Sequence, residues 1–210
     1  MAEATTKYHE ALPGSPAEEH LASRGLVNGD QMKGRLSKFR LGYVDNPLPG
    51  HDLYRGMLAI PYIRRDDEGG WSVVQMRFRC LEDHDCKGHG KYQGVSGVPT
   101  RLFNTLALMG SESKMVVTEG EIDALTASVY GIPAVGVPGG SNWKPHYREA
   151  LLGYETVYVV GDGDDAGRKF ADHVKKDLPN GRVLIAPDGE DVNSWITNPD
   201  GYKAFKERIK

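Results

Sequence analysis

Cysteine is scarce in this sequence, which has only 2 among its 210 residues, Cys80 and Cys86. Two thiols cannot form the disulfide framework of a small secreted protein, so we expect a reducing compartment. Long apolar runs are also missing, and none approaches the roughly 18 residues of a membrane-spanning helix. The first ten residues lack the basic and apolar order of a signal peptide. We therefore expect neither a disulfide-rich secreted protein nor a membrane partner.

A large excess of either charge is also lacking. The chain has 26 basic and 29 acidic side chains, a net charge of −3, and this balance argues against a strongly basic nucleic-acid binder. The apolar fraction of 39% is sufficient for a buried core. The charge is unevenly spread, because residues 1–118 hold 15 basic and 14 acidic side chains, whereas residues 119–200 hold 7 and 14. The acidic segment is either a solvated surface or a carboxylate cluster for a divalent metal.

The local patterns divide the chain into four segments. Residues 1–14 are polar and read as a flexible arm, and Ser15-Pro16 is a typical helix start. Residues 15–112 are predicted to form a small α+β subdomain whose sheet lies within residues 55–105, since strand patterns recur there. Residues 113–198 are predicted to form a metal-binding domain, and residues 199–210 a C-terminal helix.

The rhythm changes after residue 114 to alternating strands and helices. Short apolar strands separated by helices indicate a parallel sheet covered on both faces, which is the α/β class. The predicted strands are residues 115–117, 132–137, 156–160 and 182–186. The predicted helices are residues 122–130, 145–152, 165–178 and 199–209, with a short element at residues 193–196.

Acidic residues follow three of these predicted strands. Glu119 follows the first strand, Asp162 and Asp164 follow the third, and Asp191 follows the fourth. Asp123 lies one helical turn beyond Glu119 and can point back to the same edge. Open parallel sheets bind ligands at the carboxyl ends of their strands. Carboxylates gathered there suit Mg²⁺ or Mn²⁺, and such sites commonly perform phosphoryl chemistry.

Two further features at this edge offer contacts for phosphate. Arg168 opens the helix after Asp164, where a cation could meet a phosphate group. Gly139 and Gly140 follow a strand and either cradle phosphate through backbone N–H groups or form a plain turn. Both features lie in the acidic half of the chain.

The acidic segments together resemble the TOPRIM domain of primases, topoisomerases and some nucleases. The matching segments are VVTEGEIDALTASVYGIPAVGVPGG (116–140), VVGDGDDAGRKFA (159–171) and APDGEDVNSW (186–195). The upstream segments AEEHLASRGL (17–26), FRLGYV (39–44) and RGMLAIPYI (55–63) are similar to the start of the catalytic core of DnaG-type primases. The resemblance implies a TOPRIM parallel sheet flanked by helices, preceded by a smaller mixed α+β subdomain.

The resemblance implies a role for each acidic residue. Glu119 would be the central carboxylate, either a metal ligand or the base for the attacking 3′-hydroxyl. Asp162, Asp164 and Asp191 would hold Mg²⁺ or Mn²⁺, and Asp123 would support them.

The resemblance also implies that basic residues of the first half face the template, the primer or the incoming triphosphate. These residues are Arg55, Arg77, Arg79 and Lys91.

The activity implied is that of a DNA primase, a DNA-directed RNA polymerase. It would synthesise short RNA primers from NTPs on a single-stranded DNA template during DNA replication, by Mg²⁺-dependent nucleotidyl transfer. The partners implied are the template, the NTPs and the RNA primer, with a replicative helicase or a separate zinc-binding domain acting in trans. The implied location is the cytoplasm of a bacterial or phage-infected cell.

A structural zinc is not expected, because no pair of C-x-x-C motifs is present. One run has the pattern C-x₃-H-x-C-x₂-H and consists of Cys80, His84, Cys86 and His89. These residues are either ordinary loop residues or the ligands of a metal site.

Two alternatives to a primase remain open. A TOPRIM-type metal-dependent nuclease would use the same acids, and a module that binds DNA or a helicase would have kept the fold without catalysis. A topoisomerase is disfavoured, because the chain has no room for a separate domain that carries a nucleophilic tyrosine.

Overall fold

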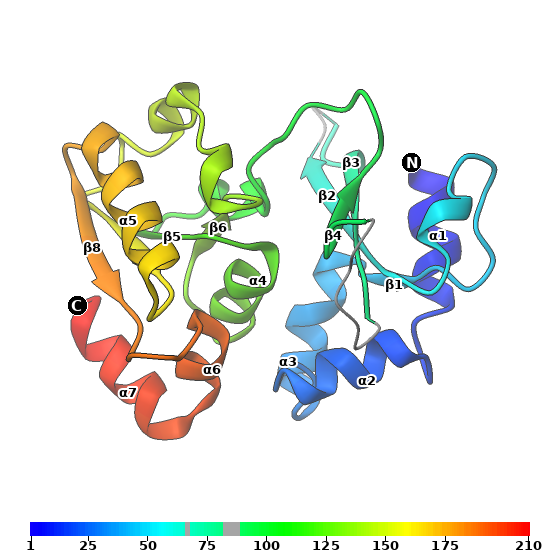
Figure 1. Ribbon diagram of the computed structural model, residues 1–210, viewed down its shortest axis with the longest axis horizontal. Helices are drawn as coiled ribbons and strands as arrows, with labels where there is room; N and C mark the ends of the chain where they lie inside the picture. The colour runs from blue at the N-terminus through cyan, green and yellow to red at the C-terminus, as the bar shows by residue number, and fades with distance from the viewer. Residues whose placement is uncertain (66–67, 82–88) are drawn as a thin grey trace. The chain divides into compact units, whose positions relative to one another are not determined.

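The computed structural model describes residues 1–65, 68–81 and 89–210. The chain divides into two compact units, Met1–Pro99 and Thr100–Lys210 (Figure 1). The sequence placed this boundary after residue 112, but residues 100–112 belong to the second unit. The reason is a pair of backbone hydrogen bonds, in which Phe103 N–H donates to Gly136 O at 2.9 Å and Gly136 N–H donates to Phe103 O at 3.2 Å.

The first unit contains the small sheet that the sequence predicted. Its strands are antiparallel in the order β1-β2-β3-β4, with bounds β1 (Gly42–Tyr43), β2 (Leu58–Arg65), β3 (Trp71–Arg79) and β4 (Tyr92–Gly94). Its helices are α1 (Ala2–Glu10), α2 (Pro16–Ser23) and α3 (Asp30–Leu36). Ser15 caps α2 by accepting a hydrogen bond from Glu18 N–H at 3.3 Å, as the Ser-Pro pattern indicates.

Residues 1–14 are not a flexible arm, because most of them form α1. Tyr8 is 1% exposed, and its hydroxyl accepts a hydrogen bond from Leu48 N–H at 2.9 Å. It also hydrogen-bonds His51 Nδ1 at 2.9 Å. A Cβ on Gly42 would lie 2.4 Å from the carbonyl carbon of Tyr8, so only glycine lets β1 approach the helix this closely. Packing of α1 therefore overrides its polar composition.

The second unit is built on a parallel sheet in the order β6-β5-β7-β8. Its strands are β5 (Lys114–Thr118), β6 (Ala134–Gly136), β7 (Thr156–Gly161) and β8 (Gly181–Ile185). Its helices are α4 (Glu121–Val129), α5 (Asp165–Asp177), α6 (Val192–Thr197) and α7 (Pro199–Arg208). The helix expected at residues 145–152 is a 3₁₀ segment, Pro145–Ala150. No helix in the described part of the chain is long and apolar enough to cross a membrane.

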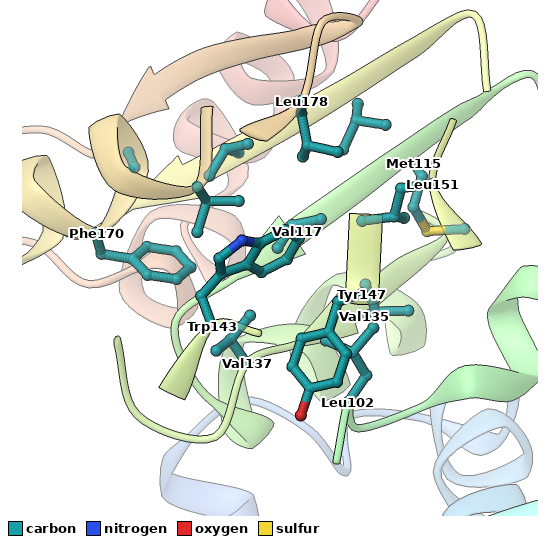
Figure 2. Packing of buried hydrophobic residues seen from close by; sticks show 14 residues of the cluster. Leu102, Met115, Val117, Val135, Val137, Trp143, Tyr147, Leu151, Phe170 and Leu178 are labelled. Carbon is teal, nitrogen blue, oxygen red and sulfur yellow. The ribbon is translucent and has the colours of Figure 1, made fainter. Parts of the chain in front are cut away.

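Alternate strand residues cover the two faces of this sheet. Val117 and Val159 pack with Phe170 of α5 in one buried cluster, which Figure 2 shows from close by. Tyr158 comes from the alternate set, and its hydroxyl donates a hydrogen bond to Lys210 O at 3.1 Å, beyond α7. Helices therefore cover both faces, and the predicted α/β class with a preceding antiparallel sheet is confirmed.

The order of the strands creates a switch point in the sheet. From β5 the chain passes to β6 on one side, and it then returns to β7 on the other side of β5. In open parallel sheets, the crevice at such a reversal is where ligands bind. The site is therefore expected at the carboxyl ends of β5 and β7.

We predict that Tyr8→Ala lowers the free energy of unfolding by about 3–5 kcal/mol, because a large buried aromatic side chain is lost. Urea denaturation measures the change. Thr6→Ala is the matched control, since Thr6 lies on the same helix and is exposed. Equal stability of the two variants would contradict a packed α1.

Candidate functional site

Glu119 and Asp162 extend from the two strands that border the switch point. Strand β5 ends at Thr118 and β7 ends at Gly161, and Thr118 pairs with Val160 in the parallel register. Glu119 follows directly after β5, and Asp162 follows directly after β7. The fold therefore brings these two predicted ligands to neighbouring strand ends.

The electrostatic environment of Glu119 reflects this crowding. Burial raises the pKa of Glu119 above its usual value, and the negative charges of Asp162 and Asp164 raise it further. A hydrogen bond from the backbone N–H of Gly140 acts in the opposite direction on this pKa. Like charges thus act on one half-buried carboxylate, which is the situation that a bound cation relieves.

Asp164 and Asp191 are the N-caps of two helices. Asp164 Oδ1 accepts a hydrogen bond from Gly167 N–H at 2.7 Å at the start of α5. Asp191 Oδ1 accepts one from Ser194 N–H at 2.6 Å at the start of α6, and the Ser194 side chain completes a capping box. Each of these carboxylates is thus oriented by a backbone donor.

Asp162 ties the end of β7 to α6. Its Oδ1 accepts a hydrogen bond from Val192 N–H at 3.1 Å. Next to it, Gly163 N–H donates to Glu190 O at 2.8 Å, and a Cβ on Gly163 would lie 1.9 Å from Pro187 O. The loops after β7 and β8 therefore touch, which places Asp162 and Asp191 at one edge.

Asp123 folds back toward the same edge, as its spacing from Glu119 predicts. It lies in the first turn of α4, and a Cβ on Gly120 would be 3.1 Å from Asp123 Oδ2. Glu121, between these two residues, is only 1% exposed. Its burial was not foreseen, because a charged side chain in a first helical turn is ordinarily solvated.

The donor chemistry of this edge fits a hard divalent cation. Glu119, Asp162, Asp164 and Asp191 offer carboxylate oxygens alone, the ligands that Mg²⁺ and Mn²⁺ prefer. Within residues 1–65, 68–81 and 89–210, no three Asp, Glu, His or Cys side chains form a ready metal-binding group. The fold gathers the predicted ligands without closing them into a coordination shell.

Gly139 and Gly140 both donate backbone hydrogen bonds to Glu119. Gly139 N–H donates a hydrogen bond to Glu119 O at 3.2 Å, and Gly140 N–H donates to the Glu119 carboxylate. The predicted phosphate cradle thus receives no support, because both N–H groups already have acceptors within the protein.

Arg168 lies at the site, in the first turn of α5 after Asp164. Its Nη2 is 2.6 Å from Asp188 Oδ1, and the two side chains are 47% and 91% exposed. Exposed pairs of this kind contribute little stability, so the guanidinium can exchange Asp188 for a phosphate at small cost. The predicted phosphate contact by Arg168 is compatible with this position.

In the first unit, β3 carries Arg77 and Arg79 beside Tyr92 of β4. The guanidinium of Arg77 lies 5.5 Å from the Tyr92 ring centroid, and that of Arg79 lies 5.1 Å from it. Arg79 is only 5% exposed, and its Nη1 donates a hydrogen bond to the Tyr92 hydroxyl. The prediction that Arg79 faces nucleic acid needs correction, because burial beside Tyr92 removes it from the surface.

Arg55 and Lys91 have more accessible surroundings. Lys91 is exposed, and Arg55 Nη1 donates a hydrogen bond to Asp45 O at 2.8 Å. Arg55 also lines a cavity of about 380 Å³ within the first unit, together with Leu53, Gly56, Met57, Cys80, His89 and Gln93. Cys80 and His89 of the Cys/His run thus line one cavity, whereas His84 and Cys86 lie outside the described residues.

His20 is a residue of this basic region that sequence reasoning missed. Its Nε2 is buried without a hydrogen-bond partner. Burial lowers the pKa of His20 from its usual 6.5 to about 4, and the positive charges of Arg79, Arg24 and Lys91 add to this effect. A histidine on α2 gives no sequence signal for this, since two of the three neighbouring charges, Arg79 and Lys91, come from distant segments.

We predict that acid destabilises the first unit through His20. The pKa of His20 is lower in the folded chain than in the unfolded chain, so the unfolded chain takes up a proton first as the pH falls. The free energy of unfolding therefore decreases between about pH 6.5 and pH 4. After allowance for solvent screening, His20→Gln should reduce this loss by about 1–2 kcal/mol. Urea unfolding at several pH values measures it, with His173→Gln, an exposed histidine on α5, as the control. The same acid loss in all three proteins would contradict the assignment.

Comparison with known proteins gives the family. A Toprim-like family model matches residues 116–196. The gene 57 protein of Mycobacterium phage D29 is 50% identical over 157 residues, which cover 75% of this chain and 100% of that protein. A DNA primase of Buchnera aphidicola is 26% identical, and the DNA helicase/primase of Enterobacteria phage T3 is 30% identical. These two matches include 76% and 70% of this chain, but only 29% of each relative.

Solved structures have the same fold. The primase fragment of the bacteriophage T7 primase-helicase is 26% identical with a TM-score of 0.64, over 90% of this chain and 72% of that one. The Aquifex aeolicus primase is 22% identical with a TM-score of 0.76, over 98% and 58%. A DnaG primase catalytic domain bound to ssDNA is 22% identical with a TM-score of 0.71, over 98% and 77%.

The Toprim match falls on the unit that carries the acidic strand ends, and the structural likeness extends over both units. The chain therefore belongs to the same family as the gene 57 protein of Mycobacterium phage D29, it contains a Toprim-like domain, and it has the fold of DnaG-type primase catalytic cores.

Proposed function

We propose that this chain is a DNA primase core that synthesises short RNA primers from NTPs on single-stranded DNA. The observation that carries the proposal is the meeting of Glu119 and Asp162 at the switch point. Burial and neighbouring carboxylates raise the pKa of Glu119, so this edge favours a cation. Nucleotidyl transfer is a reaction that needs a cation between carboxylates and phosphates.

Glu119, Asp162, Asp164 and Asp191 would hold Mg²⁺ or Mn²⁺, and Asp123 would support them. A divalent metal bound there neutralises phosphate oxygens and lowers the pKa of an attacking hydroxyl. The backbone donors to Asp162, Asp164 and Asp191 hold these carboxylates in place before any ligand arrives. Glu119 is either a further metal ligand or the base that takes the proton of the 3′-hydroxyl.

Basic side chains would contact the nucleic acid and the triphosphate. Lys91, Arg55 and Arg77 in the first unit, and Arg168 in the second, are the candidates, since phosphate contacts supply most non-specific affinity. A related primase domain is bound to ssDNA, and a relative from phage T3 is a helicase/primase. These relatives support a single-stranded template as a ligand and a replicative helicase as a partner. A zinc-binding domain in trans and a cytoplasmic location stay predictions.

We expect Glu119→Gln to reduce primer synthesis by about 10²–10⁴-fold, because a central carboxylate and its charge are lost. The assay measures labelled RNA made from NTPs and Mg²⁺ or Mn²⁺ on single-stranded templates. Glu155→Gln, which changes an exposed glutamate outside the site, should keep full activity.

The same assay separates the other functions. Cleavage of the template without NTPs, abolished by Glu119→Gln, would replace the primase proposal with a nuclease. Template binding with neither reaction would refute catalysis and leave a binding module.

A second pair of variants separates charge from folding at Asp164. Asn caps a helix about as well as Asp, so Asp164→Asn should leave the free energy of unfolding nearly unchanged. Asp164→Ala also loses the cap and should be less stable by about 0.5–2 kcal/mol. Both variants should lose primer synthesis. An Asp164→Asn protein that primes normally would show that Asp164 is only a cap.

A further inference from the structure

The loop after β6 contacts the backbone and the side chain of Glu119. This loop, residues 138–143, turns at Gly139, whose φ is +88°. Gly139 N–H donates a hydrogen bond to Glu119 O at 3.2 Å, and Gly140 N–H donates to the Glu119 carboxylate. The loop thus hydrogen-bonds both the backbone carbonyl and the side-chain carboxylate of Glu119.

Asn142 closes this loop on itself. Its side-chain Nδ2 donates a hydrogen bond to Pro138 O at 2.8 Å, and its backbone N–H donates to Gly139 O at 2.9 Å. These bonds fix the two peptide groups that precede Gly140. The side-chain bond holds the peptide group that carries the Gly139 N–H, and the backbone bond holds the peptide group that carries the Gly140 N–H.

Trp143 anchors the end of the loop in the core. The side chain is 5% exposed, and its indole N–H donates a hydrogen bond to Asp177 Oδ2 of α5 at 2.6 Å. Its ring meets that of Tyr147 edge to face, with centroids 5.7 Å apart, and both side chains pack in the cluster of Figure 2. The loop is therefore supported by the rigid part of the unit.

A side chain at position 140 would crowd the Glu119 carboxylate. A Cβ on Gly140 would lie 2.8 Å from Glu119 Oε1 and 3.0 Å from its carboxyl carbon. Any larger residue there must push the carboxylate away from its present position.

We propose that Asn142 is a positioning residue, and that residues 138–143 form a clamp that fixes the Glu119 carboxylate for the metal. Repulsion by Asp162 and Asp164 would otherwise drive this carboxylate outward, because like charges repel and Glu119 has rotatable side-chain bonds. The clamp holds it at the edge while the cation is absent. This inference rests on the proposed metal-dependent function and deepens it.

The test is a titration of the full chain with Mn²⁺, without NTP or template. Electron paramagnetic resonance measures the Mn²⁺ that stays free in solution. Loss of groups that orient metal ligands typically weakens metal affinity about 10–100-fold. We expect Gly140→Ala to weaken Mn²⁺ binding within that range, and Asn142→Ala to weaken it about 10-fold. Primer synthesis should fall in the same order.

Two matched controls separate positioning from general stability. Gly153→Ala places a Cβ in open space, since nothing lies within 4 Å of that position. Asn180 also braces a loop, because its Nδ2 donates to Leu151 O at 2.9 Å and to Tyr154 O at 2.8 Å, but it precedes β8 at the opposite edge of the sheet. Asn180→Ala should lower the free energy of unfolding at least as much as Asn142→Ala does, because two side-chain hydrogen bonds are lost and not one, while leaving Mn²⁺ affinity unchanged.

Glu119→Gln distinguishes failure of the clamp from failure of the site. If Glu119→Gln weakens Mn²⁺ binding but Gly140→Ala and Asn142→Ala bind it as the unaltered chain does, the clamp is refuted and the metal site stands. If Glu119→Gln leaves Mn²⁺ affinity unchanged, Glu119 is not a metal ligand and the clamp is refuted. If the unaltered chain binds no Mn²⁺, the proposed metal site is refuted, and the clamp with it. Equal weakening by Asn142→Ala and Asn180→Ala would also refute the clamp, because the effect would then follow stability alone.

Discussion

Repulsion between carboxylates is the constraint on which the second unit depends. Parallel strands deliver Glu119 and Asp162 to adjacent ends of the sheet, and the following loops bring Asp164 and Asp191 to the same edge. Such a group of charges destabilises the fold unless something opposes it. Backbone N–H groups do so here, because each hydrogen bond to a carboxylate stabilises its charged form and fixes its direction.

The same constraint explains how charge is distributed over the chain. The acidic half carries the strand ends, whereas the first half is close to neutral and holds Lys91, Arg77 and Arg55. Basic residues placed among the acids would satisfy them permanently and compete with a metal. Arg168 is a cation of this half, and its bond to the exposed Asp188 is readily exchanged.

Much of this unit was predictable from the sequence, since buried parallel strands leave plain apolar runs. Glu119 and Asp162 follow their strands directly, and Asp191 lies in the loop after β8. The strand ends at Glu119, Asp162 and Asp191 needed only this reading. Helix α1 was missed because Ala4, Thr5 and Tyr8 are its buried residues, too few to give a clear period. The contact of Gly140 with Glu119 and the burial of Arg79 depend on segments far apart in the chain, and single-sequence patterns contain no information on such distances.

The use of Asp164 and Asp191 as helix caps has a consequence for substitutions at these two positions. An asparagine at either position would start its helix about as well, so a variant without these two charges would keep α5 and α6 intact. The helix starts therefore require a capping oxygen at these positions and do not require its charge. The backbone of this unit therefore does not reveal whether these positions are charged, and only the side chains at the two helix starts carry that information.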